Sequence, residues 1–172
     1  SPKSAIGFDI INLCKVAAEE LASGRWKGLV IGARTENFCV GANVAIMLME
    51  AQEEEWDELE FMAREFQNAF MGLKFAPKPV VVAPYGLTLG GGYELCAVAD
   101  RVVAAAESYV GLVEVGVGVI PGAGGNKEML IRGLEGLPAG VQVDTQPILN
   151  RIFETIATAK VATSAREAQE MG

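Results

Sequence analysis

Three consecutive glycines lead into a carboxylate in Leu89-Gly-Gly-Gly-Tyr-Glu94-Leu95. Glycines let the backbone adopt unusual dihedral angles and let a ligand approach the main chain closely. A helix that begins directly after them would point unpaired N–H groups at such a ligand. The stretch therefore predicts a glycine corner and a short helix over residues 90–98, which could bind an oxyanion. A flexible turn is the alternative interpretation.

A second carboxylate lies in an apolar setting at Glu114, within Gly111-Leu-Val-Glu-Val-Gly-Val117. Burial would raise its pKa, so that it could hold a proton near neutral pH and act as a general acid. Glu94 instead falls in the first turn of the expected helix, where the helix dipole favours the ionised form. The two side chains could then be an acid and a base beside the oxyanion corner. In the alternative interpretation, Glu94 only caps a helix and Glu114 is paired with an arginine.

Short apolar runs alternate with segments of helical periodicity on both sides of these residues. The runs predict buried strands at residues 27–33 and 79–84 and a third strand at 101–106. The periodicity predicts helices at 6–22, 44–73, 90–98, 127–131, 145–156 and 164–171. The acidic run at 53–58 is either a solvated face or a break between two helices. This alternation is typical of an α/β fold with a mostly parallel sheet.

Composition excludes several kinds of chemistry. The 172 residues suit one domain, and the net charge of −8 argues against nucleic acid as a partner. We expect no membrane partner and a cytoplasmic location, because neither a membrane-spanning apolar run nor a signal peptide is present. The three cysteines lack CxxC spacing and histidine is absent, so we expect no metal site and no imidazole chemistry. Proton transfer would fall to carboxylates, lysine, tyrosine or cysteine.

Three blocks, in this order, resemble the crotonase or enoyl-CoA hydratase family. They are Phe38-Cys-Val-Gly-Ala-Asn43, the glycine corner through Glu94, and Glu114-Val-Gly-Val-Gly-Val-Ile-Pro-Gly-Ala-Gly-Gly125. The resemblance covers nearly the whole chain. It implies a crotonase-like (ClpP/crotonase) spiral of ββα units. We expect residues 1–172 to be one such domain, truncated at both ends, without the family's first strands and C-terminal helices.

The resemblance also implies a role for individual residues. Glu94 and Glu114, 20 positions apart, match the family's two catalytic glutamates, usually drawn as base and acid respectively. The N–H groups of Ala42 and Gly91 would form the oxyanion hole. The residues expected to face coenzyme A are Lys3, Val40, Gly41, Ala42 and Gly90. Where many hydratases have a lysine near the coenzyme A phosphate, this chain has Ala45.

By the same likeness, the activity would be addition of water to trans-2-enoyl-CoA in fatty-acid β-oxidation, with no metal or redox cofactor. Segments 47–60 and 133–144 look most like hydratase domains fused to 3-hydroxyacyl-CoA dehydrogenase. The expected partners are an acyl-CoA substrate and either a fused dehydrogenase domain or further copies in a trimer-type homo-oligomer. The alternatives are a Δ3,Δ2-enoyl-CoA isomerase, which needs only one carboxylate, and a non-catalytic structural module of a multifunctional protein.

Overall fold

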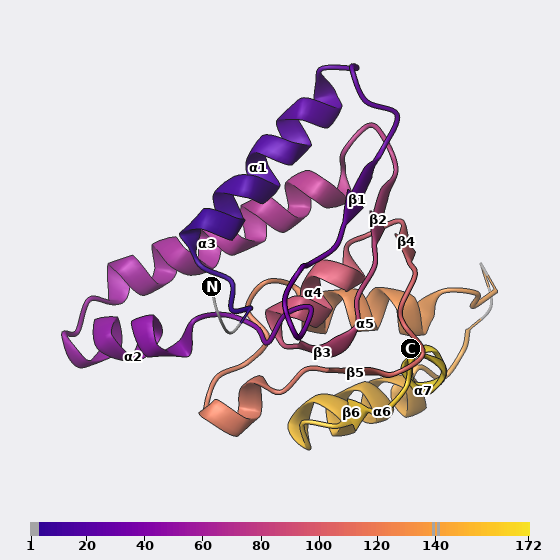
Figure 1. Cartoon of the computed structure of the whole chain (residues 1–172). Coiled ribbons are helices and arrows are strands. Elements are labelled where there is room, and N and C mark those ends of the chain that lie inside the picture. Colours follow the sequence, from indigo (N-terminus) through magenta and orange to yellow (C-terminus); the bar gives the residue numbers. More distant parts are fainter. Residues whose placement is uncertain (1–3, 139, 141) are drawn as a thin grey trace.

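Two small sheets form the framework of the computed structural model, which describes residues 4–138, 140 and 142–172 (Figure 1). The first sheet is parallel throughout, in the order β1-β2-β4, and the second has the order β3-β5-β6 with β6 antiparallel to β5. The strands are β1 (Leu29–Ile31), β2 (Val80–Val82), β3 (Gly86–Leu89), β4 (Arg101–Val102), β5 (Ser108–Gly111) and β6 (Val161–Ala162).

Consecutive strands enter different sheets and a helix then follows. β2 lies in the first sheet and β3 in the second, and α4 (Gly91–Ala97) comes directly after them. β4 and β5 repeat this order, followed by the 3-10 turn η1 (Glu114–Val117) and α5 (Gly125–Leu134). The chain therefore advances in ββα units, as expected, and each unit brings the end of a second-sheet strand to the start of a helix.

The long helical pattern is two helices. α2 (Val44–Gln52) and α3 (Trp56–Lys74) are separated at Glu54, which has a φ of 61°, so the acidic run contains a break. α1 (Phe8–Ala22) lies along α3 (Figure 1). None of the described helices is both long enough and apolar enough to cross a bilayer.

The C-terminal helices agree with the sequence pattern. They are α6 (Gln146–Ala157) and α7 (Ala165–Met171). The hydroxyl of Ser164 accepts the N–H of Glu167 at 3.1 Å, which is the predicted cap.

The main core lies between α1, α3, α4 and the inner face of the first sheet. Phe70 and Leu73 of α3 are buried against Cys14 of α1, Val82 of β2 and Leu95 of α4. A smaller core joins the second sheet to α5 and α6 through Leu112, Met129 and Ile152. Because α4 touches both cores, its position is fixed from two sides.

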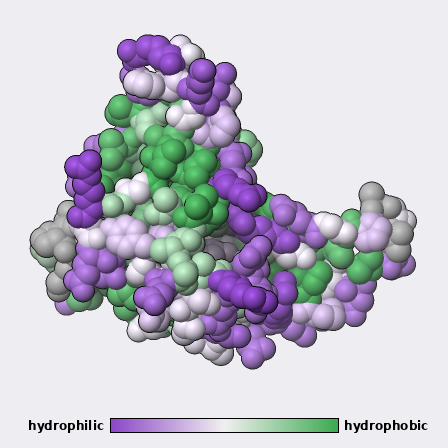
Figure 2. Space-filling model, turned by 45° about the vertical axis from the view of Figure 1, so that its right-hand side comes forward, coloured by the Kyte–Doolittle hydropathy of each residue, from purple (hydrophilic) through white to green (hydrophobic). Residues whose placement is uncertain are grey.

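The strands differ from the prediction in length, number and burial. All three predicted strands are shorter, and β3, β5 and β6 had no predicted counterpart. The prediction that the first strand is buried on both faces is wrong, since Val30 is 72 % exposed. Its register partners place it on the same outer face as Val81 and Arg101, whereas the inner residues face the core. Figure 2, which brings this side of the molecule forward, shows apolar surface in its upper part.

Candidate active site

The segment before α2 runs alongside the glycine corner. Cys39 donates its N–H to the Leu87 carbonyl at 3.0 Å and accepts the N–H of Leu89 at 2.8 Å, so it extends the edge of β3. Two residues on, Gly41 takes a φ of 98°, which favours glycine. This turn brings Ala42 to the start of α4.

Two N–H groups lie close together at that point. A β-carbon built on Gly91 would be 3.7 Å from the nitrogen of Ala42, and one built on Gly41 would be 3.5 Å from the nitrogen of Gly91. Among the hydrogen bonds of the described residues, neither Ala42 nor Gly91 donates its N–H. Two unpaired backbone donors side by side can stabilise an oxygen on which negative charge develops.

The two donors open into a cavity of about 220 Å³. Its wall is mostly apolar, and α3 contributes Leu59, Met62 and Phe66 to it. Glu94 and Glu114 also line it. The cavity therefore combines a place for an apolar chain with two carboxyls.

Glu94 lies on α4 and is only 3 % exposed. Its Oε1 accepts the N–H groups of Ala123 at 2.9 Å and of Gly125 at 2.8 Å. Burial raises the pKa of this carboxyl to about 7, and the nearby charge of Glu114 adds to the rise, against the lowering effect of the N–H donors. The helix start was expected to favour the ionised form of Glu94, whereas the pKa is raised because desolvation outweighs the N–H donors.

Glu114 begins η1 and faces Gly90. A β-carbon on Gly90 would lie 3.1 Å from the Glu114 Oε1, so a larger residue there would press on the carboxyl. Its Oε2 is buried and has no hydrogen-bond partner among the described residues, and no arginine pairs with it in that part of the chain. Burial raises the pKa of Glu114, as the sequence predicted.

The two carboxyls behave as a pair. Both pKa values are raised, and the charge of Glu114 is one cause of the rise at Glu94. Two interacting acids lose their protons in steps that belong to the pair. With its pKa raised to about 7, Glu94 can therefore carry a proton at neutral pH.

The structure describes some, but not all, of the residues expected to face coenzyme A. Val40, Gly41 and Gly90 line the cavity together with Ala42, whereas Lys3 lies outside the described residues. Within the described ranges, no group of three or more His, Cys, Asp or Glu could hold a metal ion.

Sequence reasoning missed the residues that hold Glu94. Ala123 and Gly125 lie in the third of the family blocks with no predicted role of their own, yet their N–H groups bind this carboxyl. The signal was the run Gly122-Ala-Gly-Gly-Asn126, a glycine-rich segment before a helix, which is typical of an anion-binding backbone.

Known proteins resemble this chain over most of its length. Residues 5–135 match the enoyl-CoA hydratase/isomerase family model. A probable 3-hydroxyacyl-CoA dehydrogenase from Bacillus subtilis is 50 % identical over 99 % of this chain and 21 % of the relative. A crotonyl-CoA hydratase from Syntrophomonas wolfei is 34 % identical over 60 % of this chain and 37 % of the relative.

The crystal structure of an enoyl-CoA hydratase from Bacillus anthracis aligns with a TM-score of 0.77 and 25 % identity, covering 99 % of this chain and 60 % of that one. The chain thus spans less than two thirds of each of these three proteins. The crotonase-like fold is confirmed by this likeness. Since the family match covers most of its residues, the chain belongs to the enoyl-CoA hydratase/isomerase family.

Proposed function

We propose that the chain hydrates trans-2-enoyl-CoA thioesters. One observation carries the proposal: the unpartnered Oε2 of Glu114 is buried in a cavity that also holds Glu94 and two unpaired backbone N–H groups. A buried oxygen without a partner is costly unless something else fills the site. A water molecule between the two carboxyls, next to a thioester, would satisfy it.

The thioester carbonyl oxygen would accept the N–H groups of Ala42 and Gly91. As water adds to the β-carbon, negative charge moves onto this oxygen, and the fixed donors stabilise it. Removing one such donor typically costs about 3 kcal/mol of transition-state stabilisation. The acyl chain would extend along the apolar wall formed by α3.

The proton transfers would be divided between the carboxyls. Glu94 takes a proton from the water as its oxygen bonds to the β-carbon, and protonated Glu114 gives a proton to the α-carbon. Glu94 is assigned the base in line with the role usually drawn for its counterpart in the family, and the N–H groups of Ala123 and Gly125 offset part of the rise that burial causes in its pKa. Proton exchange between the two carboxyls through the next water restores the starting state.

The proposal extends to coenzyme A binding and to the cellular setting. The backbone of Val40, Gly41, Ala42 and Gly90 would face coenzyme A, and the reaction needs neither a metal nor a redox cofactor. The setting would be cytoplasmic fatty-acid oxidation, with a dehydrogenase domain in the same protein or a homo-oligomer of this chain. The name of the Bacillus subtilis relative supports the first of these.

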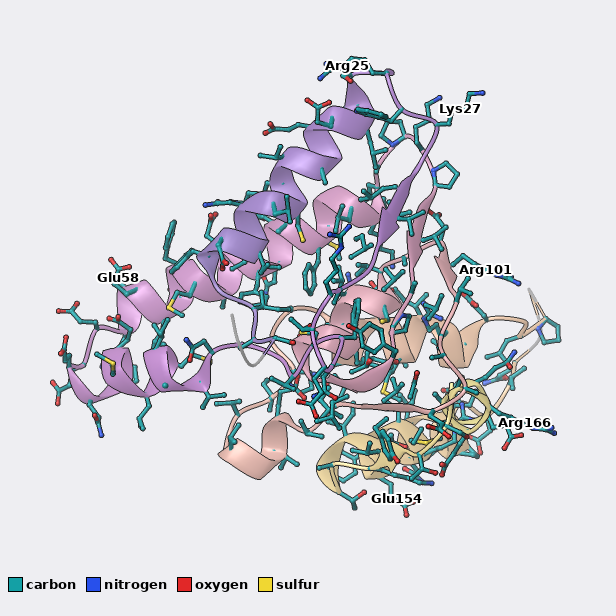
Figure 3. All side chains as sticks on the ribbon, in the orientation of Figure 1. Arg25, Lys27, Glu58, Arg101, Glu154 and Arg166 are labelled. Atoms are coloured by element: carbon teal, nitrogen blue, oxygen red, sulfur yellow. The ribbon has the colours of Figure 1, made fainter. Side chains whose placement is uncertain are left out.

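Hydration of crotonyl-CoA by the full-length protein tests the proposal through the loss of ultraviolet absorbance. Loss of a general acid typically lowers the rate about 10²- to 10⁴-fold, so we expect Glu114→Gln to fall in this range. Glu154→Gln is the matched control, because Glu154 is exposed on α6 and points away from the body of the molecule (Figure 3).

Three outcomes would contradict the proposal. Unchanged hydration in Glu114→Gln would refute the role of that residue. Conversion of 3-enoyl-CoA to 2-enoyl-CoA without hydration would indicate the isomerase. A folded protein with neither activity would indicate a structural module.

A further inference from the structure

The loop that holds Glu94 is itself held by α3. Ala123 and Gly125, the two donors to the Glu94 carboxyl, flank Gly124, which has a φ of 118° at the start of α5. The side chain of Gln67 in α3 donates to the carbonyl of Gly122 at 2.8 Å. The position of the donors thus depends on a helix that contributes no group to the carboxyl pair.

An ionic cluster around the buried carboxyl of Glu128 makes a second connection between α3 and α5. Glu128 lies in the first turn of α5 and is only 2 % exposed. Lys74, in the last turn of α3, donates to its two carboxylate oxygens at 2.6 and 2.5 Å, and Lys127 lies 3.0 Å from one of them. Burial alone would raise the pKa of Glu128, but the hydrogen bonds from Lys74 and Lys127 outweigh it and leave the pKa lowered.

The cluster is one helical turn from the donors. Glu128 also donates its own N–H to the carbonyl of Gly124 at 2.9 Å, so its backbone and its side chain both constrain the start of α5. Leaving one partner of a buried ion pair alone is strongly destabilising. A shift of the start of α5 relative to α3 would therefore separate Lys74 from a buried carboxylate.

We propose that the Lys74–Glu128 ion pair, assisted by Gln67, positions the backbone N–H groups that hold the Glu94 carboxyl. None of these side chains is assigned contact with the substrate, so each is a positioning residue. The inference rests on the proposed function, because it assigns Glu94 a role in the reaction.

Two variants that remove opposite charges can distinguish a positioning role from a direct electrostatic effect on Glu94. Lys74→Met removes a positive charge and Glu128→Leu removes a negative one, so direct effects on the Glu94 pKa would have opposite signs. Loss of position instead weakens the same two N–H bonds in both variants, and those bonds lower the pKa of Glu94. Glu114 is the charged group that most affects Glu94 among the described residues, and neither variant changes it.

The experiment measures the Glu94 carboxyl by ¹³C NMR titration of the full-length protein, assigned by comparison with Glu94→Gln, together with crotonyl-CoA hydration as a function of pH. We expect both variants to raise the pKa of Glu94 above that of the unsubstituted protein. A small displacement of a reacting group can cost up to about 100-fold in rate, so we expect kcat to fall about 10-fold with KM within about 2-fold. The pH profile of hydration should shift to higher pH in both variants. Lys74→Arg should keep the Glu94 pKa and the kcat of the unsubstituted protein.

The control is an ion pair of the same kind elsewhere on α3. Lys15 of α1 pairs with Glu65 of α3, and both side chains are partly buried. Lys15→Met should change neither the pKa of Glu94 nor kcat. Gln67→Leu changes an exposed side chain and should raise the pKa of Glu94 by less than Lys74→Met or Glu128→Leu. It supplies the test if those two variants do not fold.

Opposite shifts in Lys74→Met and Glu128→Leu, or no shift in folded variants, would overturn the positioning role. Failure of the proposed function is a separate result. If the unsubstituted protein does not hydrate crotonyl-CoA, the titration of Glu94 still decides whether the cluster sets its environment.

Discussion

Replacing Glu94 by glutamine removes a carboxyl that is 3 % exposed and whose pKa is raised to about 7. The amide oxygen of glutamine can still accept the N–H groups of Ala123 and Gly125, so the local fold is kept. The replacement therefore removes a titratable group and keeps the packing of the side chain. We expect Glu94→Gln to abolish hydration and also to make the folded protein more stable in alkali.

The direction of this change in stability follows from the linkage between folding and proton binding at Glu94. A carboxyl with a raised pKa binds its proton more tightly in the folded state than in the unfolded state. Its favourable contribution is complete below the ordinary value of 4.5 and is lost as the pH rises through about 7. The difference between these values, at about 1.4 kcal/mol per pH unit, corresponds to about 3 kcal/mol in the free energy of unfolding.

Urea unfolding followed by circular dichroism at several pH values between 4.5 and 9 measures this effect. The stability of Glu94→Gln relative to the unsubstituted protein should increase by about 3 kcal/mol across that interval, with most of the change below pH 7.5. Glu154→Gln makes the same chemical change on an exposed part of α6 and should show no such trend. Parallel curves for Glu94→Gln and the unsubstituted protein would refute the reasoning that burial sets the pKa of Glu94.

Two further predictions concern packing. A β-carbon on Gly92 would lie 2.7 Å from the Cys39 carbonyl oxygen, so Gly92→Ala should cost about 1–3 kcal/mol in urea unfolding. It should also lower crotonyl-CoA hydration, because it pushes the Ala42 segment away from α4, whereas Gly72→Ala meets only an ordinary contact at 3.5 Å and should keep full activity. Phe70→Ala should lower the free energy of unfolding by about 3–5 kcal/mol, since Phe70 is 0 % exposed in the main core; a loss below about 1 kcal/mol would contradict that placement.

The sequence was sufficient to locate most of the helices, three of the six strands of the described residues, and the two glutamates as candidates. Helical periodicity and glycine positions are local properties, so the bounds of α1, α4 and α7 follow closely from them. Glu94 and Glu114 were identifiable because each carboxylate stands in an unusual local setting. The family blocks then indicated which backbone N–H groups to pair with them.

Other features depend on contacts between distant segments. β3 begins at Gly86 and has only two strongly apolar residues, and its pairing with Cys39 and β5 is what makes it a strand. The exposure of Val30 likewise follows from which face of the sheet the helices cover, since the run itself is apolar throughout.

The pKa of Glu94 likewise depends partly on the local sequence and partly on the tertiary structure. From the sequence, Glu94 is an acid at a helix start, a position that favours its charged form. In the folded chain the Glu94 carboxyl lies against the start of α5, at the wall of the cavity that Glu114 also lines. The loss of water around it raises its pKa. Which residues carry ionisable groups is written in the sequence, but desolvation depends on every segment packed around a group, so only the tertiary structure decides how tightly each proton is held.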